Sequence, residues 1–516
     1  MVIIYFGSSA QPFQIWKKDF GIDTTTIENS KKVLVDNQGN IFQCGNYFSA
    51  LDSSNINTFI IKYDASGNLL WSQTFSSPLS RIDKINDAVL DQNSNLICAG
   101  KYSHANSSTD FLIIKYSSTG NLLWVDTVDG TSNSYDEATA LTTDLSNNIY
   151  IVGNTTTPSG YHVRTIKLDS NGFIVWDSTN TGMFNANQIS LDNSGNCIVS
   201  GNSGNSLNHS HFAIEKIDLT GSITWTKVFN TGLNSNCVKS ISDAVGNIYA
   251  LGNILNSPSA GSIWVIKLNS IGDIIWQKVI DASNGFVSDG FDFILSGNKI
   301  FLCGDSFHSN QNATQDFLTI GMDTTSQVLW TDIVNGQTDK KDYAAHLVCD
   351  TQKNVFVIGT TRDLGAEFNW LVEEYDSTGT QLFRSIIDNG YSDEGLQIEL
   401  INQNLFVCAG TNTYDVGHLD ATVMKFSVMP LLVAGVIPDS DIKFYPQPFS
   451  SALHLKMNGT IQNCNLHIFN LWGTEILNKP LIKSDEKIDF DFPKGEYFYT
   501  LIQNGIQITS GKLICQ

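Results

Sequence analysis

An internal repeat of about fifty residues is the feature that most limits how this chain can fold. Residues 59–71 (FIIKYDASGNLLW) and 112–124 (LIIKYSSTGNLLW) are nearly identical, and the pattern returns along most of the 516 residues. A large aromatic residue closes the pattern, and seven of the ten tryptophans occupy this one position. The eight aromatic positions are Trp16, Trp71, Trp124, Trp176, Trp225, Trp276, Trp330 and Phe383.

Every repeat contains four strand signals separated by turns. In the first complete copy we expect strands at 32–36, 41–47, 59–63 and 69–75. These segments are short and rich in β-branched or aromatic residues, and the turns between them are built from Asn, Asp and Gly, which tolerate positive φ. Four short strands in each repeat predict the blades of a β-propeller.

The number of strands of each type predicts how the ring closes. The outer, aromatic-bearing strand occurs eight times only if residues 13–20 are included, because the last repeat has no outer strand of its own. We therefore expect an all-β fold with an eight-bladed β-propeller over 12–428, in which strand 13–20 completes the last blade. A propeller of seven blades is the alternative prediction. The glycine of the second strand also recurs eight times, at Gly45, Gly100, Gly153, Gly201, Gly252, Gly304, Gly359 and Gly410.

The repeat also resembles known families. Its Lys-Tyr-Asp-x-x-Gly-x-x-x-Trp core, as at 62–71, is similar to the repeats of secreted bacterial β-propeller proteins and to the tryptophan-docking motif of eight-bladed quinoprotein dehydrogenases. The resemblance covers about four-fifths of the chain and implies that each aromatic residue docks between neighbouring blades. It specifies architecture and says little about activity.

A second pattern begins after the repeat. We expect residues 429–441 to be a linker, and 442–516 to form a small antiparallel β-sandwich, because apolar residues alternate there between short turns. Four motifs follow one another in this segment. They are YPQP from Tyr445, FNLWG ending at Gly473, GEY from Gly495, and GK at Gly511 and Lys512.

These motifs resemble the C-terminal sorting domain of proteins exported by the bacterial type IX secretion system. That family opens with Tyr-Pro-Asn-Pro, so Gln447 departs from it, as does the final Cys515-Gln516. The resemblance implies Sec export, the type IX machinery as partner, and a secreted or outer-membrane surface-attached protein. An accessory sandwich without this role is the alternative. The matching residues are Tyr445, Pro446, Pro448, Gly473, Gly495, Tyr497, Gly511 and Lys512.

Composition narrows the range of partners. Thirty Lys and Arg against 51 Asp and Glu give a net charge of −21, which argues against nucleic-acid binding, and no apolar run is long enough for a transmembrane helix. Residues 1–11 resemble the end of a truncated signal peptide, with an ordinary first strand as the alternative. The nine cysteines lack a C-x-x-C pair, so we expect buried thiols and leave a Cys464–Cys515 disulfide open.

No motif in the sequence indicates catalysis. Turns such as 192–196 resemble calcium loops but lack the alternating acidic ligands and the final Glu, so we interpret them as capped turns. Nucleophile-elbow, zinc-protease and phosphate-loop motifs are missing. We therefore predict no catalytic residue, no metal site and no cofactor, and leave enzymatic activity open while favouring a non-enzymatic role.

A lysine recurs in six of the eight third strands. An Asp follows two residues later in three of them, so we expect ion pairs such as Lys62–Asp64 rather than an anion-binding ring. Gly321 and Glu374 interrupt the series. The lysines are Lys62, Lys115, Lys167, Lys216, Lys267 and Lys425.

The long and variable loops are expected on one face of the ring, which we call the loop-bearing face. It receives the connections between the second and third strands and those between successive blades, and loops on a rigid scaffold commonly carry recognition. The candidate ligand residues are Tyr102, His104, Tyr135, Asp136, Tyr161, His209, His211, His308, Tyr391, Asp393, Tyr414 and His418.

Aromatic residues beside Asp, Asn and His are suited to a glycan or a protein ligand, so a non-enzymatic binding propeller is the leading hypothesis. The alternative is that these loops are solvent-exposed connections that bind no ligand. A glycan hydrolase or lyase using Asp136, Asp342, Asp393 or Glu394 is a second hypothesis, and a structural surface component is a third.

Overall fold

The structure is a computed structural model of residues 1–516. Its described part consists of β-strands and their connections, and contains no helix long and apolar enough to cross a membrane. The described residues are 12–22, 25–49, 52–77, 82–104, 108–130, 134–204, 210–230, 234–257, 260–283, 287–308, 315–336, 341–362, 367–388, 392–415, 418–428, 442–450, 452–457, 464–469, 475–481, 483–489, 493–503 and 506–516. Residues 1–11 and 429–441, expected to be a signal remnant and a linker, lie outside them.

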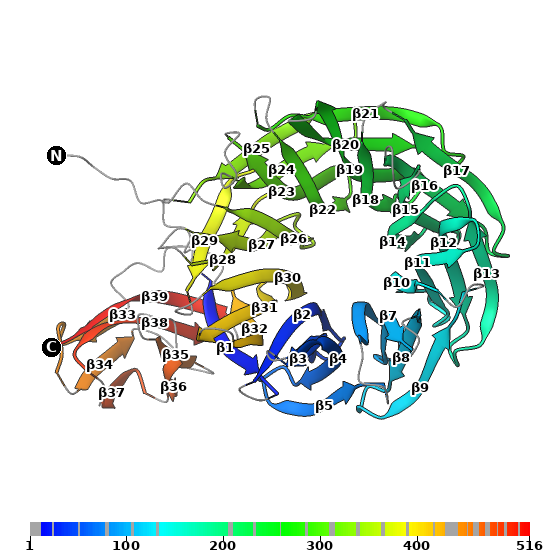
Figure 1. Ribbon diagram of the computed structural model, residues 1–516. Coiled ribbons are helices and arrows are strands. Elements are labelled where there is room, and N and C mark those ends of the chain that lie inside the picture. The colour runs from blue at the N-terminus through cyan, green and yellow to red at the C-terminus, as the bar shows by residue number, and fades with distance from the viewer. Residues whose placement is uncertain are drawn as a thin grey trace. The chain divides into compact units, whose positions relative to one another are not determined.

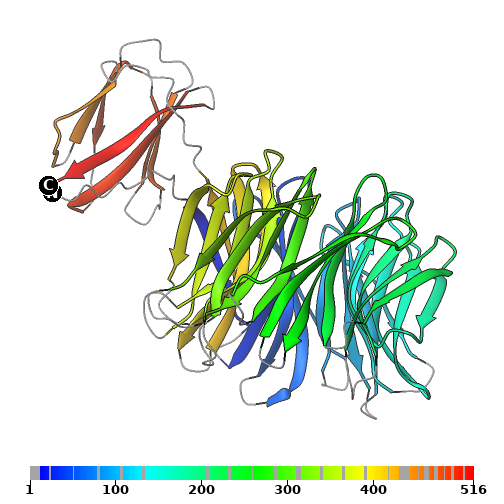
Figure 2. The same ribbon diagram turned by 90° about the horizontal axis from the view of Figure 1, so that it is seen from above.

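Four-stranded antiparallel sheets follow one another around a ring, as Figure 1 shows, so the all-β propeller prediction is confirmed. The part of the chain that the structure describes between Phe13 and Ser427 contains eight such sheets. We call them blades 1 to 8 in the order of their innermost strands. Blade 8 has the strand order β1-β32-β31-β30, which combines the first strand of the chain with the last three of the repeat. Figure 2 shows the strands of each blade running from one face of the ring to the other.

The innermost strands are β2 (Thr26–Val35), β6 (Lys84–Leu90), β10 (Asp136–Thr143), β14 (Asn185–Leu191), β18 (Ser235–Ser242), β22 (Ser288–Ser296), β26 (Tyr343–Cys349) and β30 (Asp393–Asn402). The second strands are β3 (Ile41–Ser49), β7 (Leu96–Ser103), β11 (Ile149–Thr157), β15 (Cys197–Ser203), β19 (Ile248–Ser257), β23 (Lys299–Phe307), β27 (Val355–Thr361) and β31 (Leu405–Asp415). The third strands are β4 (Asp52–Tyr63), β8 (Thr109–Tyr116), β12 (Gly160–Leu168), β16 (His211–Ile217), β20 (Ala260–Leu268), β24 (Gln315–Asp323), β28 (Asn369–Tyr375) and β32 (His418–Ser427). The outer strands are β5 (Leu69–Phe75), β9 (Leu122–Val128), β13 (Ile174–Asn180), β17 (Ile223–Phe229), β21 (Ile274–Ile280), β25 (Val328–Val334), β29 (Gln381–Ile387) and β1 (Phe13–Phe20).

The core lies between the faces of neighbouring blades. Every residue of the third strand β8 is buried, because neighbouring blades cover both of its faces. Most residues of the outer strand β5 are exposed, because neither face of that strand is completely covered. Each innermost strand also carries a β-bulge, such as the one between Gly290 and Asp292, which turns one extra residue out of the regular alternation.

A lysine and a tryptophan of one blade converge on the next blade. Lys62 Nζ and Trp71 Nε1 donate to the same carbonyl oxygen, that of Ser118, at 3.0 and 3.2 Å. The Trp71 ring lies against Gly120, where an added Cβ would come within 2.7 Å of it. Gly120 has a φ of +87°, which favours glycine, and the close approach of the Trp71 ring leaves no room for a side chain.

The expected Lys62–Asp64 ion pair is wrong, although the lysine is paired. Lys62 Nζ lies 3.1 Å from Asp36 Oδ2, in the turn that joins the first two strands of its blade. Asp64 instead accepts hydrogen bonds from the backbone N–H groups of Ser66 and Asn68 and so closes its own turn. The same pairing recurs in the ion pairs Lys115–Asp91 and Lys216–Asp192.

The two interruptions of the lysine series have different surroundings. An added Cβ at Gly321 would meet the indole of Trp330 at 2.2 Å, so that ring occupies the place of a side chain. Glu374 is buried and faces Asp350, and burial together with this like charge raises the pKa of Glu374 to about 8.

The C-terminal residues form two antiparallel sheets, with the strand orders β33-β34-β37 and β36-β35-β38-β39. Leu453, Leu466 and Leu513 are fully buried in their common core. The predicted small sandwich is confirmed. Its strands are β33 (Ile442–Tyr445), β34 (Ala452–Met457), β35 (Cys464–Phe469), β36 (Glu475–Leu481), β37 (Asp485–Asp489), β38 (Gly495–Gln503) and β39 (Ile506–Cys515).

The chain divides into two compact units. One is Lys18–Val423, and the other comprises Met424–Gln516 with the N-terminal residues up to Lys17. All nine cysteines are free thiols, including Cys464 and Cys515, and all except Cys349 are buried.

Candidate binding face

The candidate ligand residues are distributed among several blades. Tyr102 is in β7, Tyr135 precedes Asp136 at the start of β10, and Tyr161 is in β12. The remaining described candidates are His104 after β7, His211 in β16, His308 after β23, Asp393 in β30, Tyr414 in β31 and His418 in β32. His209 and Tyr391 lie outside the described residues.

Blades 2 and 3 bring several of these residues together. The rings of Tyr102 and His104 meet edge to face at 5.0 Å, and Tyr135 donates a hydrogen bond to Glu137. Burial and that hydrogen bond raise the pKa of Tyr135, and its neighbour Tyr161 contributes to the shift. Tyr135 and Tyr161 are 38% and 53% exposed, so both rings are open to solvent.

Two of the carboxylates considered for catalysis, Asp136 and Asp342, accept hydrogen bonds within the fold. Asp136 is fully buried and accepts hydrogen bonds from the backbone N–H groups of Gly130 and Thr156. Asp342 accepts them from Gly336 and Arg362 in the same way. The carboxylates thus tie the connection between two blades to the second strand of the blade that follows.

A groove of about 430 Å³ lies where blades 4, 5 and 6 meet, on the loop-bearing face. Phe291, 38% exposed, is the bulge residue of β22, and Val238 is the corresponding bulge residue of β18. The other lining residues are Ser210, Asn234, Ser235, Asn236, Asn253, Ile254, Leu255 and Asp289. Hydroxyl and amide groups therefore surround one open aromatic ring.

Hydrogen bonds from the asparagine side chains hold the strands that line the groove. Asn253 Oδ1 accepts from Gly290 N at 2.8 Å, and Asn236 Oδ1 accepts from Asn253 N at 3.1 Å. Burial raises the pKa of Asp289, whose cross-strand neighbour Asp305 has its pKa raised to about 7 by burial and by the Asp289 charge.

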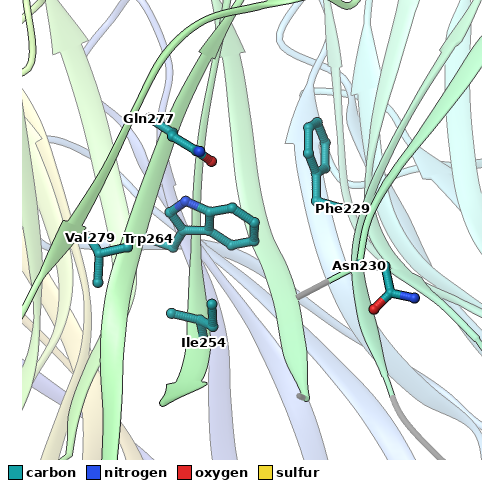
Figure 3. A pocket seen from close by; sticks show the side chains of 6 residues that line it. All are labelled: Phe229, Asn230, Ile254, Trp264, Gln277 and Val279. Carbon is teal, nitrogen blue, oxygen red and sulfur yellow. The ribbon is translucent and has the colours of Figure 1, made fainter. Parts of the chain in front are cut away.

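A second hollow, of about 560 Å³, adjoins the groove because Ile254 lines both. Figure 3 shows the indole of Trp264 between Gln277 and Ile254, with Phe229 across the hollow. Trp264 Nε1 is buried and has no hydrogen-bond partner among the described residues.

An ion pair and a buried histidine link the strands that carry the groove. Lys239 Nζ lies 2.7 Å from Asp292 Oδ1, and His346 Nε2 lies 3.5 Å from Asp292 Oδ2. Burial acts to raise the pKa of Asp292, but Lys239, His346 and the backbone N–H of Leu347 together outweigh it and hold this pKa below the usual value. Burial lowers the pKa of His346 to about 4, so its imidazole is neutral at pH 7.

Sequence reasoning missed the groove. Ligand-binding aromatic residues and histidines were expected in the loops, whereas Phe291 and Asn236 are strand residues. The available signal was the bulge position, which holds Asn86 in blade 2 and Thr139 in blade 3 but an aromatic ring in blade 6. Only the register reveals that these positions correspond.

The sorting motifs lie in the C-terminal sandwich. Tyr445 donates to Asp485 Oδ2 at 2.9 Å, and Tyr497 donates to the carbonyl of Pro493 at 2.5 Å. Gln447, the departure from the family pattern, accepts a hydrogen bond from Ile514 N at 3.2 Å. Of the other motif residues, Pro446 and Pro448 follow cis peptide bonds, Gly495 begins β38, Gly511 and the exposed Lys512 are in β39, and Gly473 lies outside the described residues.

Comparison with solved structures gives matches of low similarity over most of the chain. The WD40 domain of Neurospora crassa Pan2 is 9% identical, with a TM-score of 0.42, and the match covers 82% of this chain and 97% of that one. A protein of unknown function from Dyadobacter fermentans is 7% identical, with a TM-score of 0.39, and the match covers 82% and 100%.

Among curated proteins, an uncharacterized WD repeat-containing protein of Acanthamoeba polyphaga mimivirus is 30% identical over 115 residues. That match covers 19% of this chain and 8% of the relative's length. The family model for the secretion system C-terminal sorting domain matches residues 443–516. This match and the blade architecture agree with the resemblances found in the sequence, and identify the chain as a secreted β-propeller protein that carries a type IX secretion sorting domain.

Proposed function

We propose that this protein is a non-enzymatic binding propeller that recognises a neutral glycan through the groove beside Phe291. The observation that carries the proposal is the open Phe291 ring in a hollow lined by asparagine amides and serine hydroxyls. Sugar rings pack their apolar C–H faces on aromatic rings, and their hydroxyl groups need several hydrogen-bonding partners. The volume of about 430 Å³ lies within the usual range for small-molecule sites, about 300–1,000 Å³.

The charge of the protein favours a neutral ligand over an anionic one. The chain carries a net charge of −21, and among the described residues that line the groove Asp289 is the one with a charge. The negative net charge and the Asp289 carboxylate would both repel a sulfated or uronic-acid glycan. The adjoining hollow with the unpaired Trp264 N–H provides room for a second sugar unit.

A glycan array probed with the full-length protein tests the proposal. Calorimetric titration with the best array ligand then compares Phe291→Ala with Phe173→Ala. Phe173 is the matched control, because it is 73% exposed in a tight turn between a third and an outer strand, on the opposite face. We expect Phe291→Ala to weaken binding about tenfold or more and Phe173→Ala to leave it unchanged. The proposal would be refuted if the two substitutions weakened binding equally, or if the protein bound no glycan on the array.

One observation favours glycan hydrolysis as a second candidate function. Asp289 lines the groove next to Asp305, and both carboxyls have raised pKa values, as a general acid requires. However, Asp305 is only 1% exposed, and hydrolysis ordinarily requires two carboxylates at the scissile bond. Release of reducing sugar by the wild type but not by Asp289→Asn would establish the hydrolase instead.

A further inference from the structure

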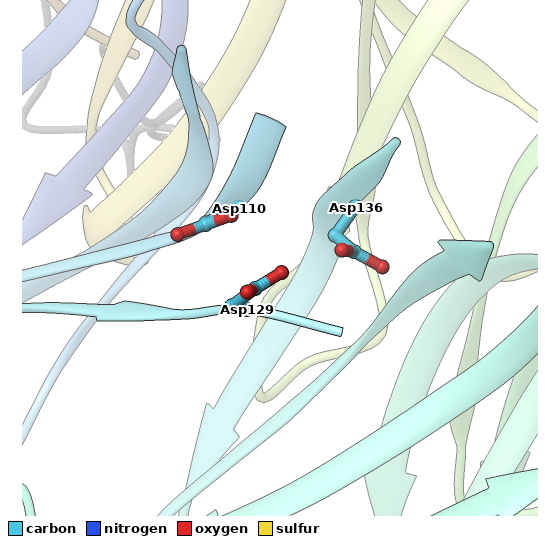
Figure 4. Close-up of side chains that lie close together, drawn as sticks. All are labelled: Asp110, Asp129 and Asp136. Carbon is cyan, nitrogen blue, oxygen red and sulfur yellow. The ribbon is translucent and has the colours of Figure 1, made fainter. Parts of the chain in front are cut away.

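Three aspartates approach one another where blade 2 passes into blade 3. Asp110 is in β8, Asp129 directly follows β9, and Asp136 begins β10. One carboxylate oxygen from each lies within 4.8 Å of the others, and Figure 4 shows the three carboxylates facing a common space. Two oxygens on opposite sides of an ion with bonds of about 2.4 Å are about 4.8 Å apart, so the spacing suits one Ca²⁺ ion.

Asp110 supplies a second observation that points to a ligand. Its side chain is buried, with 4% exposed, and His104 Nε2 lies 2.7 Å from Asp110 Oδ2. The other oxygen, Oδ1, is buried and has no hydrogen-bond partner among the described residues. A buried carboxylate oxygen without a partner is costly, and a bound cation would remove that cost.

The surroundings of the three carboxylates contain little compensating charge. Among the described residues, no Lys or Arg forms an ion pair with any of them. Arg164 donates to the backbone oxygen of Asp129 at 2.8 Å, but its guanidinium is paired with Asp177. Asp136 Oδ1 accepts hydrogen bonds from the Thr155 hydroxyl and from Thr156 N, which use both of its lone pairs. Asp136 Oδ2 accepts only from Gly130 N, so this oxygen keeps a lone pair for a metal.

The arrangement is also confined to one blade. The corresponding positions hold Asn57, Ser76 and Asp83 around blade 1, and Asp316, Asn335 and Asp342 around blade 6. No blade other than blade 2 has a carboxylate at all three positions. The repeat scaffold therefore does not require this trio.

From these observations we infer that Asp110, Asp129 and Asp136 form a binding site for a calcium ion. Carboxylate oxygens are the ligands that Ca²⁺ prefers, and water completes its coordination where the exposed Asp129 opens to solvent. The ion would link the start of β8 and the end of β9 to the start of β10, and so stabilise the junction between the two blades. Extracellular modules commonly bind Ca²⁺ with dissociation constants of about 10⁻⁴–10⁻³ M.

Titration of the chelator-treated full-length protein with CaCl₂, followed by calorimetry and by thermal unfolding, tests the inference. We expect one Ca²⁺ per chain and a rise in Tm with calcium. Asp129→Asn should weaken binding at least tenfold, and it should still fold because Asp129 is exposed. Asp316→Asn is the matched control, since Asp316 occupies the same position in blade 6 and pairs with His308 as Asp110 does with His104.

The absence of heat and of a Tm shift up to about 10 mM calcium, well above the expected constant, would overturn the inference. An Asp316→Asn variant as impaired as Asp129→Asn would overturn the location of the site. Equally tight Mg²⁺ binding would overturn the assignment to calcium, because Mg²⁺ requires shorter bonds of about 2.0–2.1 Å. None of these outcomes depends on glycan binding.

Discussion

Replacing Lys115 by Met tests the buried ion pair that the recurring lysine forms within its blade, together with its hydrogen bond to the next blade. Lys115 Nζ lies 3.0 Å from Asp91 Oδ2 and donates to the carbonyl of Ser170 in blade 3 at 3.1 Å. The side chains of Lys115 and Asp91 are 3% and 1% exposed, so the substitution leaves a buried carboxylate without its cation. Breaking a buried ion pair from one side costs about 3–5 kcal/mol.

The cost converts to a measurable shift in melting temperature. An unfolding entropy of about 2.1 cal/mol/K per residue over the roughly 400 propeller residues gives about 0.85 kcal/mol/K. The expected fall in Tm is therefore about 3–6 °C, with the lower end favoured because Asp91 keeps its hydrogen bonds from Asn93 and Asn95.

Scanning calorimetry at pH 7 measures this shift. Lys227→Met is the matched control, because Lys227 and Asp273 are 3.6 Å apart and 36% and 60% exposed. An exposed pair contributes at most about 1 kcal/mol, so the control should lose about 1 °C or less. If Lys115→Met lowers Tm no more than Lys227→Met does, the buried Lys115–Asp91 pair does not stabilise the propeller as described above.

Three further predictions follow from the repeat and the tail. Glu374→Lys should pair with Asp350 and raise Tm. The same variant should reduce, but not remove, the loss of stability expected between about pH 5 and 8 in the wild type. A carboxyl with a raised pKa favours the folded state only while it is protonated, and Asp305, whose pKa is raised to about 7, still contributes to that loss. Thermal unfolding across pH measures both changes. Gly120→Ala should lower Tm by several degrees, because the Cβ would strike the Trp71 ring at a φ of +87°, and an unchanged Tm would contradict the docking. Deletion of 442–516 should prevent export, and an undiminished amount of protein in the culture medium of the native host would contradict the sorting role.

The fold was largely predictable because the repeat encodes it locally. The aromatic position at Trp71, the turn at 64–68 and the strand periods each recur, so one copy supports the interpretation of the others. The partner of Lys62 was not predictable from spacing. Asp64 is near in sequence but occupied in its own turn, whereas Asp36 comes close only through the pairing of the strands.

The candidate sites depended on tertiary structure. Phe291 is exposed because a bulge turns it out of β22, and nothing in its immediate sequence distinguishes it from a core residue. Asp110, Asp129 and Asp136 are separated by 19 and 7 residues, which matches no calcium-loop spacing, so the sequence analysis predicted no metal site. Only the junction between two blades brings the three carboxylates together.

The central claim is that the groove between blades 4, 5 and 6 is where this exported propeller binds its ligand. A crystal structure of the full-length protein with its best glycan-array ligand tests that claim most directly. We predict a sugar ring packed on Phe291, with its hydroxyl groups hydrogen-bonded to Asn236 or Asn253. Ligand density at the exposed Tyr135 and Tyr161 instead, with the groove filled only by solvent, would contradict it.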